Sequence, residues 1–239
     1  MLAFRILYED DFLIVVDKPT GFHTHPPEDQ AVRIAPKWNG LRILERQFQM
    51  KLYPVHRLDR ASSGVLVLSK KRELNGHLQS QFAERTVHKQ YAFLARGEIR
   101  GSRTLNDPIA TEAGAMQEAF TGVAPVHTFA LSIPTKTGEE ARAFTIAWAY
   151  PETGRFHQIR RHLARAGHPL VNDSRHGDKK LNRAFAEKTG LSRLLLRCME
   201  MRFRHPDSGA EMKVRTRWSR DWHKVFELSG ICPLPRERD

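Results

Sequence analysis

Residues 56–70 read HRLDRASSGVLVLSK, and this stretch decides how the chain is interpreted. A single acid, Asp59, stands between Arg57 and Arg60, in a segment whose Ser and Gly residues favour a turn. The residues after the turn, 65–69, are almost entirely aliphatic and predict a buried strand. Two interpretations follow. Either the arginines neutralise a structural acid, or they keep an ionised carboxylate ready to react inside an anionic substrate.

Positive charge is concentrated in one part of the chain. The 239 residues include 39 Lys and Arg against 27 Asp and Glu, a formal net charge of +12. Residues 155–220 hold 17 basic and 6 acidic side chains, so nearly all of the excess lies there. A localised basic surface predicts a polyanionic partner, most often nucleic acid, whereas a merely solubilising surface would spread its charge.

Several classes of protein are not indicated. Cys198 and Cys232 give neither a disulfide framework nor a metal-binding spacing, and His23 and His25 lack a clear third ligand. No glycine-rich phosphate loop occurs, so we expect no bound metal and no cofactor. No 18-residue apolar run and no secretory leader is present, which predicts a cytoplasmic protein without membrane contact.

The apolar periodicity predicts more strands than helices. We expect strands at 12–16, 65–69, 89–96, 126–133, 144–150, 194–203 and 212–218, helices at 41–48, 73–85 and 157–166, and a last helix from Ser219 to Gly230. Residues 101–125 predict loops with a short strand. Because the strands are often adjacent in sequence, we predict an α+β fold, a single domain around a mixed, largely antiparallel sheet with flanking helices.

Two further residues are candidates for a site. Arg160 lies at the edge of the apolar face of the predicted helix 157–166, and a buried arginine needs an acid partner, for which Asp59 is a candidate. Tyr91 lies within a predicted strand, where its ring could stack on a base and its hydroxyl could act as an acid, a base or an orienting group. Both could instead be structural, Arg160 with a packed stem and a solvated head, and Tyr91 as a core residue.

Four motifs, in a fixed order, resemble those of the RluA-type pseudouridine synthases. They are Lys18-Pro19-x-Gly21, the HRLDRASSGVL of residues 56–66, Lys89-Gln90-Tyr91, and the TGRFHQIRRHLARAGHPL of residues 153–170. The segment DSRHGD at 173–178, followed by Asn182-Arg183, is similar to the TruC branch of the family, which modifies a uridine in the acceptor-stem region of tRNA. The chain departs from the family at Ser62, where Thr is usual, and at Arg197, where His is usual.

The resemblance implies a reaction and a set of roles. The fold implied is the pseudouridine synthase fold, a single catalytic domain over residues 1–239 without the S4-type N-terminal domain of some relatives. The reaction implied isomerises a uridine within RNA, without a cofactor: the base detaches, rotates and rejoins through carbon. Asp59 is implied as the essential carboxylate, acting as a nucleophile or by removing a ribose proton. Arg160 would pair with Asp59, Tyr91 would stack on the extruded base, and Arg57 would occupy the gap left in the RNA stack.

The resemblance also sets the expected partners. RNA contacts are expected from His56, Arg57, Arg60, Arg155, His157 and Arg161. We expect a tRNA substrate, with ribosomal RNA as one alternative and a catalytically idle RNA-binding module as another. No obligate protein partner is expected. The target uridine, the oligomeric state and the part played by Arg197 stay open at this point.

Overall fold

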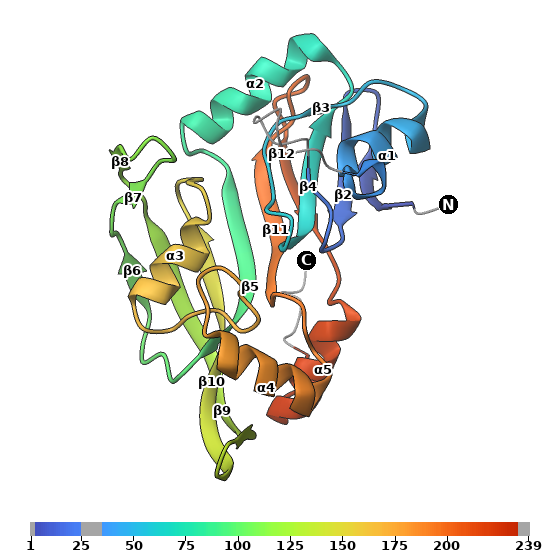
Figure 1. Ribbon diagram of the computed structural model, residues 1–239. Coiled ribbons are helices and arrows are strands. Elements are labelled where there is room, and N and C mark those ends of the chain that lie inside the picture. The colour runs from blue at the N-terminus through green and yellow to red at the C-terminus, as the bar shows by residue number, and fades with distance from the viewer. Residues whose placement is uncertain (1–2, 25–34, 234–239) are drawn as a thin grey trace. The chain divides into compact units, whose positions relative to one another are not determined.

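The computed structural model describes residues 3–24 and 35–233 (Figure 1). The elements in chain order are β1 (Arg5–Glu9), β2 (Leu13–Lys18), η1 (Pro36–Trp38), α1 (Gly40–Phe48), β3 (Tyr53–Pro54), β4 (Ser63–Ser69), α2 (Arg72–Ala83), β5 (His88–Arg96), β6 (Arg103–Leu105), β7 (Ile109–Ala110), β8 (Met116–Gln117), β9 (Thr121–Thr135), β10 (Gly138–Pro151), α3 (Gln158–Arg165), α4 (Lys179–Thr189), β11 (Leu196–Arg204), β12 (Glu211–Arg215) and α5 (Arg220–Ser229). His25 lies outside the described residues. None of the helices in the described part of the chain has the length and apolar content needed to span a bilayer.

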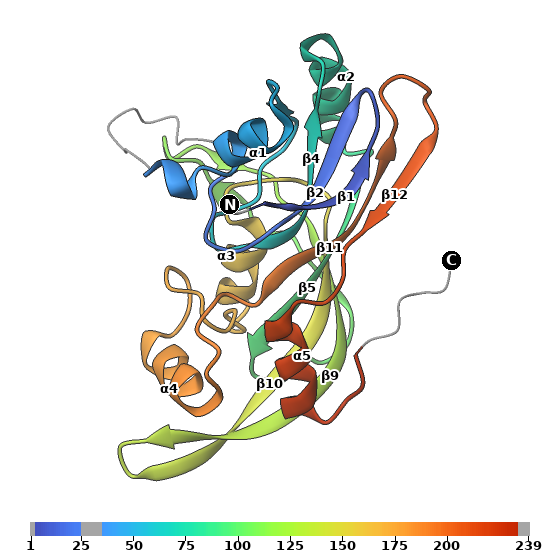
Figure 2. The ribbon, with the colours of Figure 1, turned by 90° about the vertical axis from the view of Figure 1, so that its right-hand side faces the viewer.

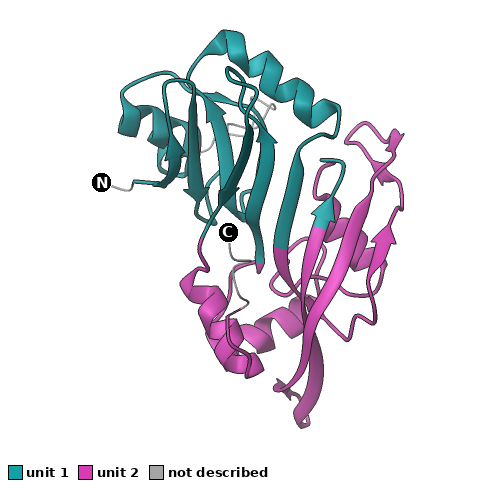
Figure 3. Cartoon of the chain, turned by 180° about the vertical axis from the view of Figure 1, so that it is seen from behind, with its two compact units in different colours: residues 1–91, 150–154, 196–216 teal, residues 92–149, 155–195, 217–239 magenta. Residues whose placement is uncertain are grey.

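The chain forms two compact units, each built from three separate segments (Figure 3). Unit 1 comprises residues 1–91, 150–154 and 196–216, and unit 2 comprises residues 92–149, 155–195 and 217–239. The chain passes between the units within β5 and β10. Because neither unit is contiguous in sequence, no linker marks a boundary, and a single catalytic domain over residues 1–239 stays a prediction.

The sheet of unit 1 has the strand order β1-β2-β4-β11, with β3 added to β4 and β12 added to β11. Figure 2 shows β1 beside β2 and β12 beside β11. β2 runs antiparallel to β4, from Leu13 opposite Ser69 to Lys18 opposite Gly64. β11 runs parallel to β4, and its Cys198 also lies opposite Gly64. The sheet is therefore mixed, with antiparallel pairs on either side of the parallel one, and the predicted α+β class is confirmed.

β4 is buried along almost its whole length, which explains its composition. Every residue from Gly64 to Ser69 is buried, and α2 packs against β3, β4 and β11. A strand that is covered on both faces reads as a continuous apolar run and not as an alternation of apolar and polar residues. The run at 65–69 is therefore the signal of a central strand, as predicted.

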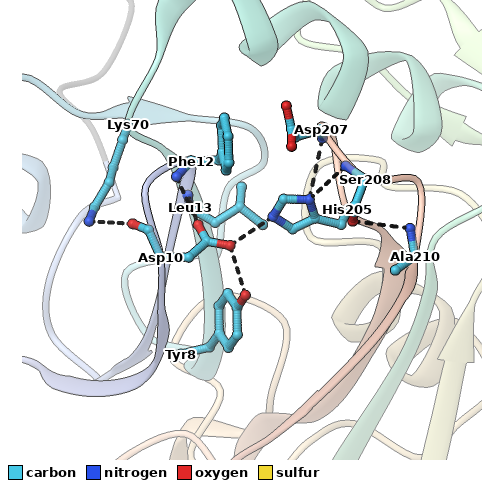
Figure 4. Close-up of polar contacts among 9 residues, drawn as sticks. All are labelled: Tyr8, Asp10, Phe12, Leu13, Lys70, His205, Asp207, Ser208 and Ala210. Carbon is cyan, nitrogen blue, oxygen red and sulfur yellow. Dashed lines mark hydrogen bonds and ion pairs between the residues drawn. The ribbon is translucent and has the colours of Figure 1, made fainter.

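A polar cluster joins the turn after β1 to the turn after β11 (Figure 4). The Asp10 carboxylate accepts hydrogen bonds from the Tyr8 hydroxyl at 2.7 Å and from His205 Nε2 at 2.8 Å. His205 Nδ1 accepts from the backbone amides of Asp207 and Ser208, at 3.3 and 3.1 Å. Because Nδ1 accepts two amide protons, Nε2 is the nitrogen that carries the proton shared with Asp10. The cluster fixes two turns that lie 195 residues apart in sequence.

Unit 2 is built on a long hairpin. β9 and β10 extend the predicted strands to Thr121–Thr135 and Gly138–Pro151, and the turn between them uses Gly138 at a φ of +137°. β6 pairs with β9, the short strands β7 and β8 pair with each other, and α3, α4 and α5 all contact β9. The region 101–125, predicted as loops with a short strand, contains three short strands and the beginning of β9.

The structure differs from the prediction in one helix that was not expected and in one strand that ends earlier than expected. Helix α4 was not predicted, because its only deeply buried apolar side chain, Phe185, gives a narrow stripe; Asp178 caps it by accepting from the amides of Lys180 and Leu181. The predicted strand 212–218 ends at Arg215, since Trp218 instead packs against Trp222 of α5, with ring centroids 5.3 Å apart. The four predicted helices are all present within two residues of their expected limits.

Candidate active site

Asp59 lies in a turn that a neighbouring loop holds in place. The Asp59 carbonyl accepts a hydrogen bond from the Ser62 amide at 3.0 Å, immediately before β4 begins. The Thr24 hydroxyl donates to the Leu58 carbonyl at 3.0 Å and accepts from the Leu58 amide at 3.1 Å. The Gly21 amide donates to the Arg60 carbonyl at 2.7 Å. The Lys-Pro-x-Gly turn and the acidic turn, about forty residues apart in sequence, therefore form one structure.

Lys18 is the buried cation of this structure. Its side chain is fully buried, and Nζ donates to the carbonyls of Pro19, Phe22 and Ser62 at 3.2, 2.9 and 2.8 Å. Burial lowers the pKa of Lys18 to about 7, while the nearby carboxylates of Asp59 and Asp17 act in the opposite direction. Lys18 was noted only as part of a motif, and the structure shows that its charge acts on Asp59.

Gly64 allows β2, β4 and β11 to come together at the site. Lys18 and Cys198 lie opposite Gly64 on its two neighbouring strands. Gly64 has a φ of +112°, and a Cβ atom built there would lie 2.0 Å from the Cys198 carbonyl oxygen. The Gly of the Ser-Ser-Gly sequence is therefore required by both its backbone conformation and the close approach of β11.

Tyr91 lies beside Asp59 and Cys198 within unit 1. Burial raises the pKa of Tyr91 well above its ordinary value, and the charge of Cys198, a hydrogen bond with Cys198 and the charge of Asp59 act in the same direction. Burial also raises the pKa of the Cys198 thiol to about 12. Both groups are consequently neutral at pH 7, and the Tyr91 hydroxyl keeps its proton next to the carboxylate of Asp59.

Lys89 precedes Tyr91 by two residues on β5, so the two side chains share one face of the strand. Burial lowers the pKa of Lys89 to about 8, and Cys198 acts against this shift. Lys89 Nζ lies 3.4 Å from the Thr153 carbonyl oxygen. The site in unit 1 thus contains two lysines with lowered pKa values in addition to the arginines that the sequence emphasised.

The residues flanking Asp59 differ in their surroundings. Arg60 Nε donates to the Gly21 carbonyl at 3.2 Å, and Arg57 is exposed. His56 is half-buried; its ring stacks on Phe82 with centroids 4.9 Å apart, and its Nε2 accepts from the Val67 amide at 3.0 Å. Burial, together with the charge of Lys89, lowers the pKa of His56 to about 3, so its ring is neutral. RNA contacts by these three residues stay a prediction.

Arg197 lies on β11 and is buried. Its guanidinium Nη2 donates to Asp17 Oδ2 at 2.6 Å and to the Thr216 hydroxyl at 2.9 Å. Since side chains alternate along a strand, Arg197 and its neighbour Cys198 point to opposite faces of β11. Arg197 is therefore paired with Asp17 on one face of the sheet, while its positive charge also acts to lower the pKa of Cys198.

Arg160 belongs to unit 2, where it is buried on α3. Its Nε and Nη2 donate to the two carboxylate oxygens of Asp173 at 2.7 and 2.8 Å. Burial would raise the pKa of Asp173, but the hydrogen bond from Arg160 and the amides of His176 and Arg175 prevail and lower it to about 2. Sequence reasoning missed Asp173 as a partner of Arg160; the pairing of Arg160 with Asp59 stays a prediction.

The other polar residues around α3 hold the segment 107–120. They donate to its backbone carbonyls: Arg155 to Glu118, Gln158 to Phe120, Arg161 to Ala110, His162 to Asp107 and Arg165 to Pro108. Arg161 and Arg165 each have a backbone acceptor, and Arg165 is exposed. His157, the residue before α3, has a left-handed φ of +54° and contacts His176.

Comparisons with known proteins give relatives of this chain. Residues 12–165 match the family model described as RNA pseudouridylate synthase. The chain is 32% identical to the tRNA pseudouridine synthase C of Yersinia pestis, over 96% of this chain and 93% of that protein. It is also 32% identical to the tRNA pseudouridine synthase C of Haemophilus ducreyi, over 94% and 95%.

Solved structures share the fold. The structure named human RNA pseudouridylate synthase domain containing 4 is 20% identical, covers 95% of this chain and 93% of its own, and has a TM-score of 0.71. The structure named human RNA pseudouridylate synthase domain containing 1 is 22% identical, covers 90% and 83%, and has a TM-score of 0.69. At this identity the likeness concerns the fold alone.

Proposed function

The chain belongs to the RNA pseudouridylate synthase family, and on that premise we propose that it converts a specific uridine of tRNA to pseudouridine, with Asp59 as its catalytic carboxylate. The relatives named above are tRNA enzymes by their names, which favours tRNA over ribosomal RNA. We place the reaction in the cytoplasm, where tRNA is used. No cofactor is required in this proposal, because the product is an isomer of the substrate.

The observation that supports the proposal is that Asp59 interacts electrostatically with two buried groups, the Lys18 ammonium and the Tyr91 hydroxyl. The charge of Asp59 acts on both Lys18 and Tyr91, which are 41 and 32 residues away in sequence. A carboxylate at this place can attack the ribose or base as a nucleophile, or can remove a ribose proton. Lys18 would balance its negative charge, which would otherwise repel the RNA phosphates.

Tyr91 would act on the extruded base. Extruding a base costs a few kcal/mol of stacking and pairing, and an aromatic platform returns about 1–3 kcal/mol for each stacked base. Its raised pKa keeps the hydroxyl protonated, so it can donate a proton or a hydrogen bond while the base is detached. In this scheme N1 of the uracil loses its bond to the ribose and gains a proton, C5 gains the new bond, and the C5 proton is released.

Arg160 and the exposed Arg57 complete the proposal. We propose that Arg160, oriented by Asp173, pairs with Asp59, and that Arg57 fills the gap left by the extruded base. His56, Arg60, Arg155, His157 and Arg161 would contribute to the RNA-binding surface. The basic side chains of residues 155–220 would supply most of the salt-dependent affinity for RNA.

Asp59→Asn provides the test. We expect the variant to bind tRNA with a Kd close to that of the wild type and to release no tritium from RNA that carries 5-tritiated uridine. Glu73→Gln, at an exposed acid on α2, is the matched control and should turn over normally. Turnover by the Asp59 variant would remove Asp59 from its role.

A position-resolved map of pseudouridine identifies the substrate. Total RNA is compared from a strain that lacks the gene and from the same strain complemented with the wild type or with the Asp59 variant. A uridine in tRNA that is modified only with the wild type supports the proposal. A site confined to ribosomal RNA would contradict the tRNA assignment, and no site at all would favour an idle RNA-binding module.

A further inference from the structure

Four side chains in unit 2 form a cluster outside the proposed catalytic residues, which we call the phosphate cluster: Phe156, His157, Arg175 and His176. The rings of Phe156 and His157 stack with centroids 3.9 Å apart. The Arg175 guanidinium carbon lies over the Phe156 ring at 5.4 Å, and His157 Nδ1 lies 2.9 Å from His176 Nε2. Arg175 is exposed and the other three are half-buried, so the cluster borders solvent.

The Asp173 turn fixes two of these side chains. The Asp173 carboxylate accepts two bonds from Arg160, one on each oxygen, and its Oδ1 also accepts from the backbone amides of Arg175 and His176, each at 2.9 Å. The Asp173 carbonyl accepts from the Gly177 amide, where a Cβ atom would lie 2.4 Å from that oxygen. The DSRHG sequence thus folds into a tight turn that sets the direction of Arg175 and His176, and the cluster is organised before any ligand binds.

Three arginines carry the positive charge of this region: Arg161, Arg165 and Arg175. In the described part of the chain, no carboxylate lies within ion-pairing distance of Arg161, Arg165 or Arg175. Arg161 and Arg165 lie one turn apart on α3, and burial together with the charges of Arg165 and Arg175 lowers the pKa of Arg161. Asp173, the neighbouring acid, is already occupied by Arg160. Uncompensated arginines in a preformed arrangement are typical of a phosphate site.

The stacking of Arg175 on Phe156 favours the same ligand. A guanidinium that contacts an aromatic face still has N–H groups that can donate to a phosphate as a fork. The His157–His176 bond adds a second feature. One imidazole must donate and the other must accept, so the pair cannot hold a proton on both of the facing nitrogens. The pair can therefore take up one additional proton when a negative charge arrives.

We propose that Arg175, with Arg161 and the His157–His176 pair, binds one phosphodiester group of the RNA outside the target uridine. This inference rests on the proposed function, since RNA supplies the phosphate. Phe156 orients Arg175 and does not touch the ligand. The site would help to choose among RNAs, because a phosphate must reach this point while the target base is extruded.

The site predicts a pH dependence of RNA binding. Burial and the charges of Arg160, Arg175 and Arg161 lower the pKa of His176, whereas Asp173 raises it; His157 is its hydrogen-bonding neighbour. A bound phosphate opposes the arginines and raises that pKa. Binding is then accompanied by proton uptake, so affinity increases as the pH falls through the His176 pKa in the complex.

The experiment measures tRNA binding in the Asp59→Asn background, where no turnover occurs, as a function of salt and of pH. We expect Arg175→Ala to weaken binding about 3- to 10-fold and to reduce the slope of log Kd against log salt by about 0.7–0.9, as for one lost phosphate contact. Arg100→Ala is the matched control, because Arg100 is an exposed arginine outside residues 155–220 and is paired with Glu98 at 3.0 Å. An equal effect of the two arginine variants would overturn the phosphate site.

His176→Gln tests the coupled proton, because glutamine can keep a hydrogen bond to His157 but cannot be charged. We expect it to abolish a part of the pH dependence between pH 8 and pH 5.5 that the exposed His77→Gln control retains. A wild-type pH profile in His176→Gln would overturn the role of the histidine pair. Thermal unfolding verifies that each variant is folded.

The two proposals fail in different ways. If the wild type modifies no uridine and Arg175→Ala still lowers the salt slope, the proposed function fails and the phosphate site stands. If the wild type modifies tRNA and Arg175→Ala behaves as Arg100→Ala, the phosphate site fails and the proposed function stands.

Discussion

Arg160 and Asp173 form a two-point ion pair inside unit 2, with both nitrogen–oxygen distances below 3 Å and both side chains almost completely buried. The same carboxylate holds the amides of the turn that carries Arg175 and His176. One acid therefore orients a proposed catalytic arginine and organises the proposed phosphate cluster.

Asp173→Asn should destabilise the protein strongly. It leaves the buried Arg160 guanidinium without a negative partner, and breaking a buried pair from one side costs about 3–5 kcal/mol. Urea unfolding at pH 7 measures the free energy of unfolding. Arg183→Ala, which removes an exposed arginine of an i,i+4 pair, should change it by less than about 0.5 kcal/mol. A similar small change in Asp173→Asn would show that the pair does not stabilise unit 2.

Gly64→Ala should be poorly tolerated. The added Cβ would meet the Cys198 carbonyl at a φ that alanine rarely adopts, and we expect a loss of about 3 kcal/mol or more. Gly76→Ala on α2 is the matched control, since nothing lies within 4 Å of its Cβ position. That change should stabilise the helix by about 0.5–1 kcal/mol. Thermal unfolding of both variants checks the contrast, which equal Tm values would contradict.

The Asp10 cluster should make stability depend on acid. Burial acts to raise the pKa of Asp10, but its bonds from Tyr8, Phe12, Leu13 and His205 prevail and lower it from 3.8 to about 2. The stabilisation, about 2 kcal/mol, is present above pH 3.8 and is lost as the pH falls through 2. Asp10→Asn should remove this dependence.

Denaturant unfolding between pH 2 and 6 provides the measurement for Asp10. The difference in unfolding free energy between wild type and Asp10→Asn should shrink as the solution becomes more acidic. Asp11→Asn, at the exposed neighbouring acid, should leave the profile unchanged. A constant difference across this pH range would contradict the assignment.

Tyr91→Phe separates stacking from proton transfer. Phenylalanine keeps the ring but loses the hydroxyl beside Asp59 and Cys198. We expect nearly normal tRNA binding and a single-turnover rate lowered about 100-fold or more, as is typical when a general acid or base is removed. Cys198→Ser, which keeps a hydrogen-bonding group next to Tyr91, should retain most of the rate. A wild-type rate in Tyr91→Phe would restrict Tyr91 to stacking and packing.

The sequence by itself determined much of this protein. The aliphatic run 65–69 identified a central strand because a strand covered on both faces needs apolar residues throughout. The α+β class followed from adjacent strands, and the four ordered motifs indicated the family. Asp59 and Tyr91 could each have been structural on the residues alone, and their proposed roles come from the resemblance to the family.

Only the tertiary structure decided which side chains meet. Lys18 acts on Asp59, and Arg160 pairs with Asp173, because strand register and helix packing bring distant residues together. Arg197 faces away from Cys198 because neighbouring residues alternate across a strand, which requires the strand itself to be known. Sequence spacing limits which residues can be neighbours. Which buried charges are paired depends on the tertiary structure, since an unpaired buried charge would cost several kcal/mol.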